Sequence, residues 1–323
     1  MVLPLINRIE AIYYPVLACV GVPVNLAAIV ILSQGKCGLS GCVTRYLVGM
    51  AAADLLVVLS NPVLKWTREF HFQDSFLSIT PVCRLLTVAE FAAIFTSVWL
   101  TVTFTLDRFV AICCEKFKRK YCTERTAAVA IGIVSVLGCA ESAPWFFLFE
   151  HVYIINNVPW HCVPSETFLH SIAWGAFEMS HFMLTACTPF VFILLLNIMT
   201  ASRVLSASKV RRALRGRRDG ENVEDAELKN RKRSVILLFC ISGSFILLWG
   251  TYVGHRFYVR ISGNYVYTST SDPSFIAEHA SRMLQILSTC TNTCIYVVTQ
   301  RKFRAELLRV VTYPSKAILK LCK

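Results

Sequence analysis

Long stretches of apolar residues, separated by short polar segments, dominate the pattern along the chain. A helix needs about 20 mostly apolar residues to cross a bilayer. Seven stretches meet this requirement, so we predict seven transmembrane helices over residues 11–33, 44–66, 82–113, 126–149, 171–205, 230–258 and 276–299. The predicted fold class is therefore an all-α membrane protein, a seven-transmembrane helix bundle with a short amphipathic helix after the seventh span.

These stretches divide the chain into three parts. Residues 1–10 are predicted to lie outside the membrane, residues 11–299 form the seven-helix domain, and residues 300–323 form an amphipathic helix and tail. In residues 301–308 basic and apolar residues alternate at helical spacing, which is typical of a helix on a membrane surface. We expect no cleavable signal peptide, because no basic region followed by a small-residue cleavage site begins the chain.

Composition and charge support a membrane location and indicate an orientation. The chain is 55% hydrophobic and 16% charged, whereas soluble domains carry about 25% charged residues. Much of the net charge of +13 comes from segments on one side of the predicted bundle, around residues 36–45, 116–125, 209–218 and 301–323. The positive-inside rule makes this side cytoplasmic, with the N-terminus extracellular and the C-terminus cytoplasmic. We expect anionic membrane lipid, and no nucleic acid, beside the basic residues.

The triplet Asp107-Arg108-Phe109 lies at the cytoplasmic end of the third stretch. A charge pair is costly at bilayer depth, so it is expected at a helix end or where it has a function. On a helical projection Glu90, Ser97, Thr101 and Arg108 lie close to one line. We therefore predict a polar stripe that faces the bundle interior, with Glu90 near the outer surface and Arg108 at the inner end.

Topology singles out two of the fourteen cysteines. Only Cys83 and Cys162 face the oxidising side, so we predict a disulfide that ties the third helix to the loop before the fifth. Two free thiols are the alternative. Cys322 in the basic tail is either a palmitoylation site or a plain thiol.

Ionisable residues of four predicted helices lie at comparable depth near the outer surface, namely Glu90, His181, Arg256 and Arg282. We predict that they converge in an outer ligand-binding cavity. Phe91, Trp249 and Tyr252 are spaced to add aromatic surface there. This pattern suits a zwitterion whose ammonium pairs with the carboxylate and whose own carboxylate pairs with an arginine.

Each of these residues also has a structural interpretation. Arg256 and Arg282 could extend to lipid headgroups, and His181 could be a core histidine with a polar partner. Glu90 could support the fold, or could pair internally with either arginine. Glu141 and Glu178 are expected near the outer interface, and we assign them no role.

Asp54 is the only charged residue in the interior of the second stretch, between Arg45 and Lys65 near its two ends. Asn25, Ser97, Ser288 and Asn292 could surround it at mid-membrane, and such a cluster of oxygens suits a monovalent cation. We therefore predict a sodium site and expect no other cofactor. A protonated Asp54 that is hydrogen-bonded to the same neighbours is the alternative.

Residues in every part of the chain resemble the signature positions of rhodopsin-like (class A) G-protein-coupled receptors. They are Gly21-Val22-Pro23-Val24-Asn25, Leu47, Ala51-Ala52-Ala53-Asp54-Leu55, Cys83, Asp107-Arg108-Phe109, Pro189, Trp249 and Asn292-Thr293-Cys294-Ile295-Tyr296. The resemblance implies a heterotrimeric G protein as partner. It also implies that Asp107, Arg108, Phe109, Asn197, Asn292 and Tyr296 take part in coupling or switching.

Within this family the chain looks most similar to the orphan receptors numbered 139 and 142. The likeness rests on residues 13–34, the Ala-Ala-Ala-Asp turn at residues 51–54, Glu90-Phe91, Thr96-Ser97 and Trp99. It implies an aromatic amino acid or a short peptide as ligand, and coupling to Gq.

The chain departs from the family pattern at several positions. Phe109 replaces a tyrosine, Thr251 and Thr293 replace prolines, Asn197 replaces a tyrosine, and Arg231 stands where some receptors carry a glutamate. Loss of the proline at Thr251 removes a cause of helix kinking. Without a glutamate at Arg231, the inactive state loses one partner for Arg108, so we expect some basal activity.

Other functions fit the sequence less well. No lysine lies between residues 275 and 301, which excludes a retinal Schiff base in the seventh helix. We find no repeat typical of transporters, and no nucleophile–base pair or metal-ligand motif of an enzyme. The alternatives are a receptor-like scaffold that does not signal and, less favoured, a membrane transporter.

Overall fold

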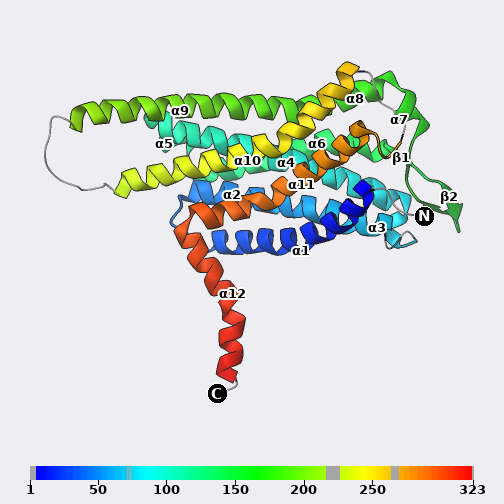
Figure 1. Ribbon diagram of the computed structural model, residues 1–323, viewed down its shortest axis with the longest axis horizontal. Coiled ribbons are helices and arrows are strands. Elements are labelled where there is room, and N and C mark those ends of the chain that lie inside the picture. Colours follow the sequence, from blue (N-terminus) through cyan, green and yellow to red (C-terminus); the bar gives the residue numbers. More distant parts are fainter. Residues whose placement is uncertain (1–4, 71, 73, 216–225, 263–268, 322–323) are drawn as a thin grey trace.

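The computed structural model describes residues 5–70, 72, 74–215, 226–262 and 269–321. Long helices lie side by side over most of this length (Figure 1). The transmembrane segments are built from α1 (Leu5–Ser33), α2 (Gly41–Val58), α4 (Thr80–Cys113), α6 (Glu124–Ser142), α8 (Ile172–Phe182) with α9 (Thr188–Arg215), α10 (Ala226–Ser262) and α11 (Pro273–Thr299). The predicted seven-helix bundle is confirmed, although α1 begins six residues before its predicted start at residue 11.

By length and apolar composition, six helical segments among the described residues qualify as membrane spans. The seventh helix, α11, is more polar because it carries Glu278, His279, Arg282 and many Ser and Thr residues. It packs mainly against α10 and α1. Its polar side chains Ser281, Thr289, Asn292 and Thr293 are buried inside the bundle, which explains why a less apolar helix can complete it.

Two spans contain π-helical segments that the sequence analysis did not predict. Residues Leu59–Lys65 continue α2 into the short helix α3 (Trp66–Phe70), and this π-helical segment contains Pro62. Residues Met183–Cys187 join α8 to α9, just before Pro189. A proline removes a backbone donor, so a wider turn is a common accommodation. The sixth span, α10, is one continuous helix through Thr251, as expected where a proline is absent.

The segment between α6 and α8 folds over one end of the bundle as two small antiparallel ladders. Strand β1 (Phe149–Glu150) pairs with β4 (Val163–Pro164), and β2 (Tyr153–Ile155) pairs with β3 (Val158–Trp160). Asn156 and Asn157 form the turn between β2 and β3 with φ of 51° and 62°. Asparagine tolerates this left-handed conformation, and two such residues are typical of a hairpin turn. The Asn-Asn pair is a signal in the sequence for this turn, which we did not predict.

Short helices complete the connections. They are a 3₁₀ turn at Phe76–Ser78, α5 (Glu115–Tyr121), a 3₁₀ segment at Ala143–Phe147 and α7 (Glu166–His170). After α11, the helix α12 (Arg301–Leu321) turns away from the bundle (Figure 1). Phe303 anchors its start, because this ring is fully buried and packs edge-on against Tyr296 at 5.8 Å. The predicted helix after the seventh span is present, and it extends well beyond residue 308. Cys322 and the side chain of Arg231 lie outside the described part of the chain.

Candidate ligand site and switch region

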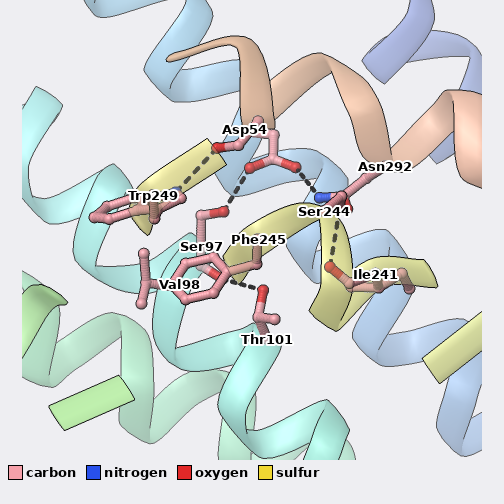
Figure 2. Close-up of a pocket in the computed structure, with 10 residues that line it drawn as sticks. Asp54, Ser97, Val98, Thr101, Ile241, Ser244, Phe245, Trp249 and Asn292 are labelled. Atoms are coloured by element: carbon pink, nitrogen blue, oxygen red, sulfur yellow. Dashed lines mark hydrogen bonds between the residues drawn. The ribbon is translucent and has the colours of Figure 1, made fainter. Parts of the chain in front are cut away.

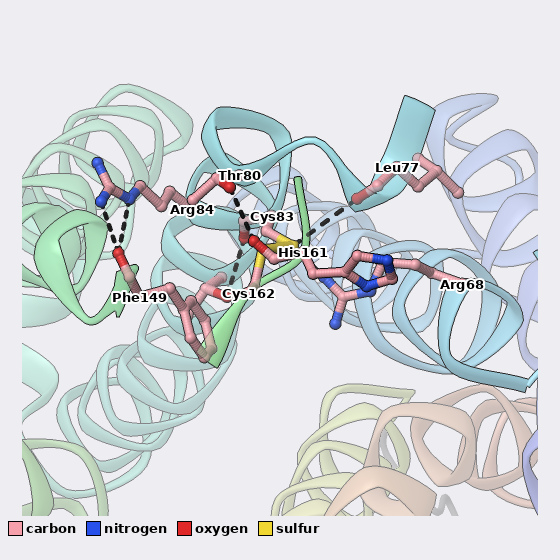
Figure 3. The surroundings of a disulfide bond; sticks show 9 residues. Arg68, Leu77, Thr80, Cys83, Arg84, Phe149, His161 and Cys162 are labelled. Carbon is pink, nitrogen blue, oxygen red and sulfur yellow. Dashed lines mark hydrogen bonds between the residues drawn. A yellow bond between two sulfur atoms is a disulfide. The ribbon is translucent and has the colours of Figure 1, made fainter. Parts of the chain in front are cut away.

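A disulfide between Cys83 and Cys162 confirms the predicted link between the third span and the loop before the fifth. The loop is held to α4 by further bonds (Figure 3). The Thr80 hydroxyl donates to the His161 carbonyl at 2.7 Å, and Arg84 donates through Nε and Nη2 to the Phe149 carbonyl at 2.9 and 2.6 Å. We call this end of the bundle the disulfide end, and the opposite end, which carries Asp107 and Arg108, the Asp107 end.

Glu90 is buried on α4 near the disulfide end. Asn61 Nδ2 donates to its Oε1 at 2.5 Å, and Lys65 Nζ lies 3.5 Å from its Oε2. Both partners belong to the π-helical segment that extends α2. The sequence allows Arg256 or Arg282 as an internal partner of Glu90, whereas the described ion pair of Glu90 is with Lys65.

The two arginines each have a carboxylate partner of their own. Arg256 on α10 pairs with Glu178 on α8, and Arg282 Nη2 lies 2.6 Å from Oε1 of Glu278, one turn earlier on α11. Arg282 is also within electrostatic reach of Glu90 and Tyr252, and Arg256 is within reach of Tyr252 and Arg282. Arg282 is therefore the residue that links this group, since it is within electrostatic reach of both Glu90 and Arg256.

His181 has a different neighbourhood. Its Nδ1 lies 2.7 Å from Oε1 of Glu141 on α6, and both side chains are largely buried. Its ring contacts Phe91 and Trp145 edge-on, with centroids 5.1 and 5.2 Å apart. Phe91 itself stacks on Trp145 at 4.5 Å. His181 thus matches the alternative of a core histidine with a polar partner.

Ion pairs between neighbouring spans recur around the disulfide end. Besides the pairs above, His279 Nδ1 on α11 lies 2.7 Å from Oε1 of Glu10 on α1. The interhelical pairs are His279–Glu10, Lys65–Glu90, His181–Glu141 and Arg256–Glu178. We had assigned no role to Glu141 and Glu178. Their position in the sequence was a usable signal, because a carboxylate inside an apolar span requires a polar or charged partner.

Trp249 lies deeper in the bundle, beneath this charged layer. Its indole Nε1 donates to the Ser288 hydroxyl at 3.1 Å. Phe245 stacks on its ring at 5.2 Å, and Tyr252 contacts it edge-on at 6.2 Å. Trp249 therefore connects the aromatic residues of α10 to α11.

Asp54 is almost fully buried at mid-bundle. The Ser97 hydroxyl donates to its Oδ1 at 2.5 Å, and Asn292 Nδ2 donates to its Oδ2 at 2.8 Å (Figure 2). Asn25 does not share this cluster through its amide nitrogen, which instead donates to the carbonyls of Gly21 and Thr289 at 2.9 and 3.0 Å.

A cavity of about 20 Å³ adjoins Asp54. It is lined by Asp54, Ser97, Val98, Thr101, Ile241, Ser244, Phe245, Trp249, Ser288 and Asn292 (Figure 2). This volume suits one water molecule or a small ion. A carboxylate with nearby hydroxyl and amide oxygens is also the donor set that a hard monovalent cation prefers, so the residues fit the predicted sodium ion.

At the Asp107 end, Arg108 pairs with its sequence neighbour. Its Nε donates to Asp107 Oδ2 at 3.0 Å, its Nη2 contacts the same oxygen, and both side chains are buried. The Cys42 thiol, in the first turn of α2, donates to the other carboxylate oxygen, Oδ1, at 3.1 Å. Phe109 lies nearby but lines a separate cavity of about 430 Å³, together with residues of α9.

Two polar atoms predicted to belong to the switch lack a hydrogen-bond partner among the described residues. They are Oδ1 of Asn197 and the hydroxyl oxygen of Tyr296. Both side chains are buried, and that of Tyr296 completely so. A buried polar group without a partner is costly, so each such atom requires an explanation.

Comparison with known proteins decides the family. The family model described as "7 transmembrane receptor (rhodopsin family)" matches residues 24–296. The chain belongs to the rhodopsin family of seven-transmembrane receptors. It is 25% identical over 311 residues to mouse probable G-protein coupled receptor 142, which covers 94% of this chain and 73% of that protein.

Other relatives of this rhodopsin-family receptor are receptors of different kinds. C-C chemokine receptor type 1 of Macaca fascicularis is 22% identical over 303 residues, covering 91% of this chain and 77% of the relative. The sex peptide receptor of Drosophila melanogaster is 21% identical over 238 residues, covering 68% of this chain and 54% of the relative. The alignments extend over most of the bundle, so they support the family assignment and not a particular ligand.

One departure of this receptor from the family pattern has a visible structural consequence. Thr293 stands where a proline is expected, and its hydroxyl donates to the Val24 carbonyl at 3.3 Å. The bond links α11 to α1. A proline has no side-chain donor, so this contact is specific to the threonine.

Proposed function

We propose that this receptor transmits the binding of an extracellular ligand to a heterotrimeric G protein at the plasma membrane. The disulfide end would face the outside, and the Asp107 end the cytoplasm. The basic residues of the loops after α1 and α4 and of α12 support this orientation, since they flank the Asp107 end. A disulfide at the opposite end agrees with an oxidising exterior.

The proposed ligand is a zwitterion, either an aromatic amino acid or a short peptide. The observation that carries this proposal is that Arg282 is within electrostatic reach of both Glu90 and Arg256. The ligand's ammonium would pair with Glu90, and its carboxylate would form a bidentate pair with Arg256 or Arg282. Tyr252 and Trp249 would contact its aromatic side chain.

Every charged group in this set already has a partner within the protein. Glu90 contacts Lys65, Arg256 contacts Glu178, and Arg282 contacts Glu278. The ligand must therefore exchange these internal pairs for new ones, and only the difference in free energy contributes to binding. We expect a dissociation constant of about 1 μM or weaker. The same exchange makes the ligand's contacts differ between the resting and active states, and ligand-driven switching requires such a difference.

Activation would release Arg108 from Asp107, so that its guanidinium reaches the G protein in the coupled state. The buried oxygens of Asn197 and Tyr296, which have no hydrogen-bond partner among the described residues, would then gain one. Coupling to Gq is the variant that we propose, with calcium release as its readout.

The test is a panel of amino acids and short peptides applied to cells that express the receptor, with calcium and cAMP as readouts. An active compound is then compared with its deaminated and amidated analogues on wild type and on Glu90→Gln. Glu141→Gln is the matched control, because Glu141 is a buried carboxylate that pairs with His181. Glu90→Gln should weaken the response to the amine-bearing compound far more than the response to the deaminated one. Equal losses would show that Glu90 supports the fold only.

A scaffold that does not signal is the alternative. It would give no nucleotide exchange on any G protein, with or without ligand. Agonist-driven exchange on purified Gq would exclude it.

A further inference from the structure

Asp107 is contacted by two thiols in addition to Arg108. The Cys42 thiol on α2 donates to carboxylate oxygen Oδ1 at 3.1 Å. The Cys122 thiol, between α5 and α6, lies 3.5 Å from the Asp107 backbone carbonyl. Arg108 contacts the other carboxylate oxygen, Oδ2, through Nε and Nη2. The two oxygens of one carboxylate are thus divided between an arginine on the same helix and a thiol on another.

The contact with Cys42 is shielded from solvent. Cys42 is 3% exposed and Asp107 is 7% exposed, so water competes little for the carboxylate. A thiol is a weak hydrogen-bond donor, and a hydroxyl at the same place would be a stronger one. Because the donor lies on α2, the bond fixes the rotation of the carboxylate relative to a neighbouring span. With Oδ1 held by Cys42, Oδ2 faces Arg108.

We propose that Cys42 is a positioning residue for the Asp107–Arg108 pair, and that its thiol sets how readily Arg108 is released. The inference rests on the proposed function, because basal signalling is the property that it would control. A stronger donor at residue 42 would favour the resting pair, and loss of the donor would let the carboxylate turn away from Arg108. The strength of the donor, and not the mere presence of a side chain, then determines basal activity.

The experiment measures nucleotide exchange without ligand on purified Gq, using receptor in lipid nanodiscs. Cys42→Ala should raise the basal rate about threefold, the equivalent of a weak hydrogen bond, and Cys42→Ser should lower it below wild type. Cys37→Ala is the matched control. Cys37 is also a buried cysteine at this end of the bundle, but its thiol faces the Ile31 carbonyl at 3.9 Å. Equal basal rates for the alanine, serine and wild-type receptors would overturn the proposal.

Two further measurements separate this proposal from the function on which it rests. If wild type and Arg108→Ala show the same exchange under all conditions, the proposed signalling function fails. The contact itself is then tested by the thermal unfolding midpoints of Cys42→Ala, Asp107→Ala and the double variant, followed by tryptophan fluorescence. We expect the double variant to lose less than the sum of the two single losses. Additive losses would refute the coupling of Cys42 to Asp107, whatever the G-protein result.

Discussion

The ammonium of Lys65 lies 3.5 Å from the carboxylate of Glu90, and the pair joins the π-helical segment after α2 to α4. The Lys65 side chain is 34% exposed and that of Glu90 is 10% exposed. A pair that is partly open to solvent contributes little to stability. Its consequence for the proposed function is that Lys65 already occupies the carboxylate that would bind a ligand ammonium.

Removal of this competitor should increase the response to amine-bearing ligands. We expect Lys65→Gln to improve the potency of an active zwitterion about two- to fivefold, the range that a surface ion pair allows. The potency of the deaminated analogue should not improve. Concentration–response curves for both compounds provide the measurement. A loss of potency for the zwitterion would indicate that Lys65 itself contacts the ligand.

The disulfide should contribute strongly to folding, because it closes a loop with a sequence separation of 79. Removal of a native disulfide typically costs about 2–5 kcal/mol. Cys83→Ser and Cys162→Ser should therefore each lower cell-surface expression, measured by flow cytometry, and lower the midpoint of thermal unfolding. Cys19→Ser is a suitable control, since Cys19 is an exposed free cysteine. Normal expression of both variants would contradict the prediction.

Much of the architecture follows from the sequence alone. The length of the apolar stretches is enough to find the spans, because bilayer thickness fixes the length of a crossing helix. Topology identified Cys83 and Cys162, and a common depth at mid-membrane placed Ser97 and Asn292 near Asp54. These predictions depend on the length of each helix, the side of the membrane on which each loop lies and the depth of a residue along its own helix.

Side-chain partners between helices were harder to predict. Lys65 reaches Glu90 from a π-helical segment, and a π-helical turn changes the face on which the following residues lie. Glu141 and Glu178 were recognised as charges, but their partners depend on how α6, α8 and α10 are rotated against one another. A period of 3.6 residues gives the relative positions on one helix and not this mutual rotation.

Arg108 should be required for coupling but not for ligand binding. Arg108→Ala should abolish agonist-driven nucleotide exchange, because the side chain that would reach the G protein is missing. Agonist affinity, measured by binding, should stay within about threefold of wild type. Arg45→Ala is the matched control, since Arg45 is an exposed arginine whose pair with Glu124 is also exposed. Unchanged exchange by Arg108→Ala would reject the proposed mechanism.

The Cys122 thiol should react slowly with alkylating reagents. Burial, followed by the charge of Asp107, raises the pKa of Cys122 from 9.0 to about 11. A raised pKa favours the neutral thiol, whereas the thiolate is the reactive form. At pH 8 the thiolate fraction should be about a hundredfold lower than for a thiol with the ordinary pKa, and it should rise about tenfold per pH unit up to pH 10. Mass spectrometry of maleimide-treated receptor measures this rate. Fast labelling at pH 7 would contradict the predicted environment.

Sodium should reduce agonist affinity if the ion binds beside Asp54. The ion would occupy the cavity of about 20 Å³ that Asp54, Ser97 and Ser288 help to line, and it would favour the resting state. If the agonist binds one state better and the ion binds the other state better, each lowers the affinity of the receptor for the other. Replacement of choline chloride by sodium chloride at constant ionic strength should therefore lower agonist affinity. Asp54→Asn should remove the dependence, because the amide keeps the shape of the side chain and loses its charge. If sodium has no effect on wild type, a protonated Asp54 held by Ser97 and Asn292 is the better description of this site.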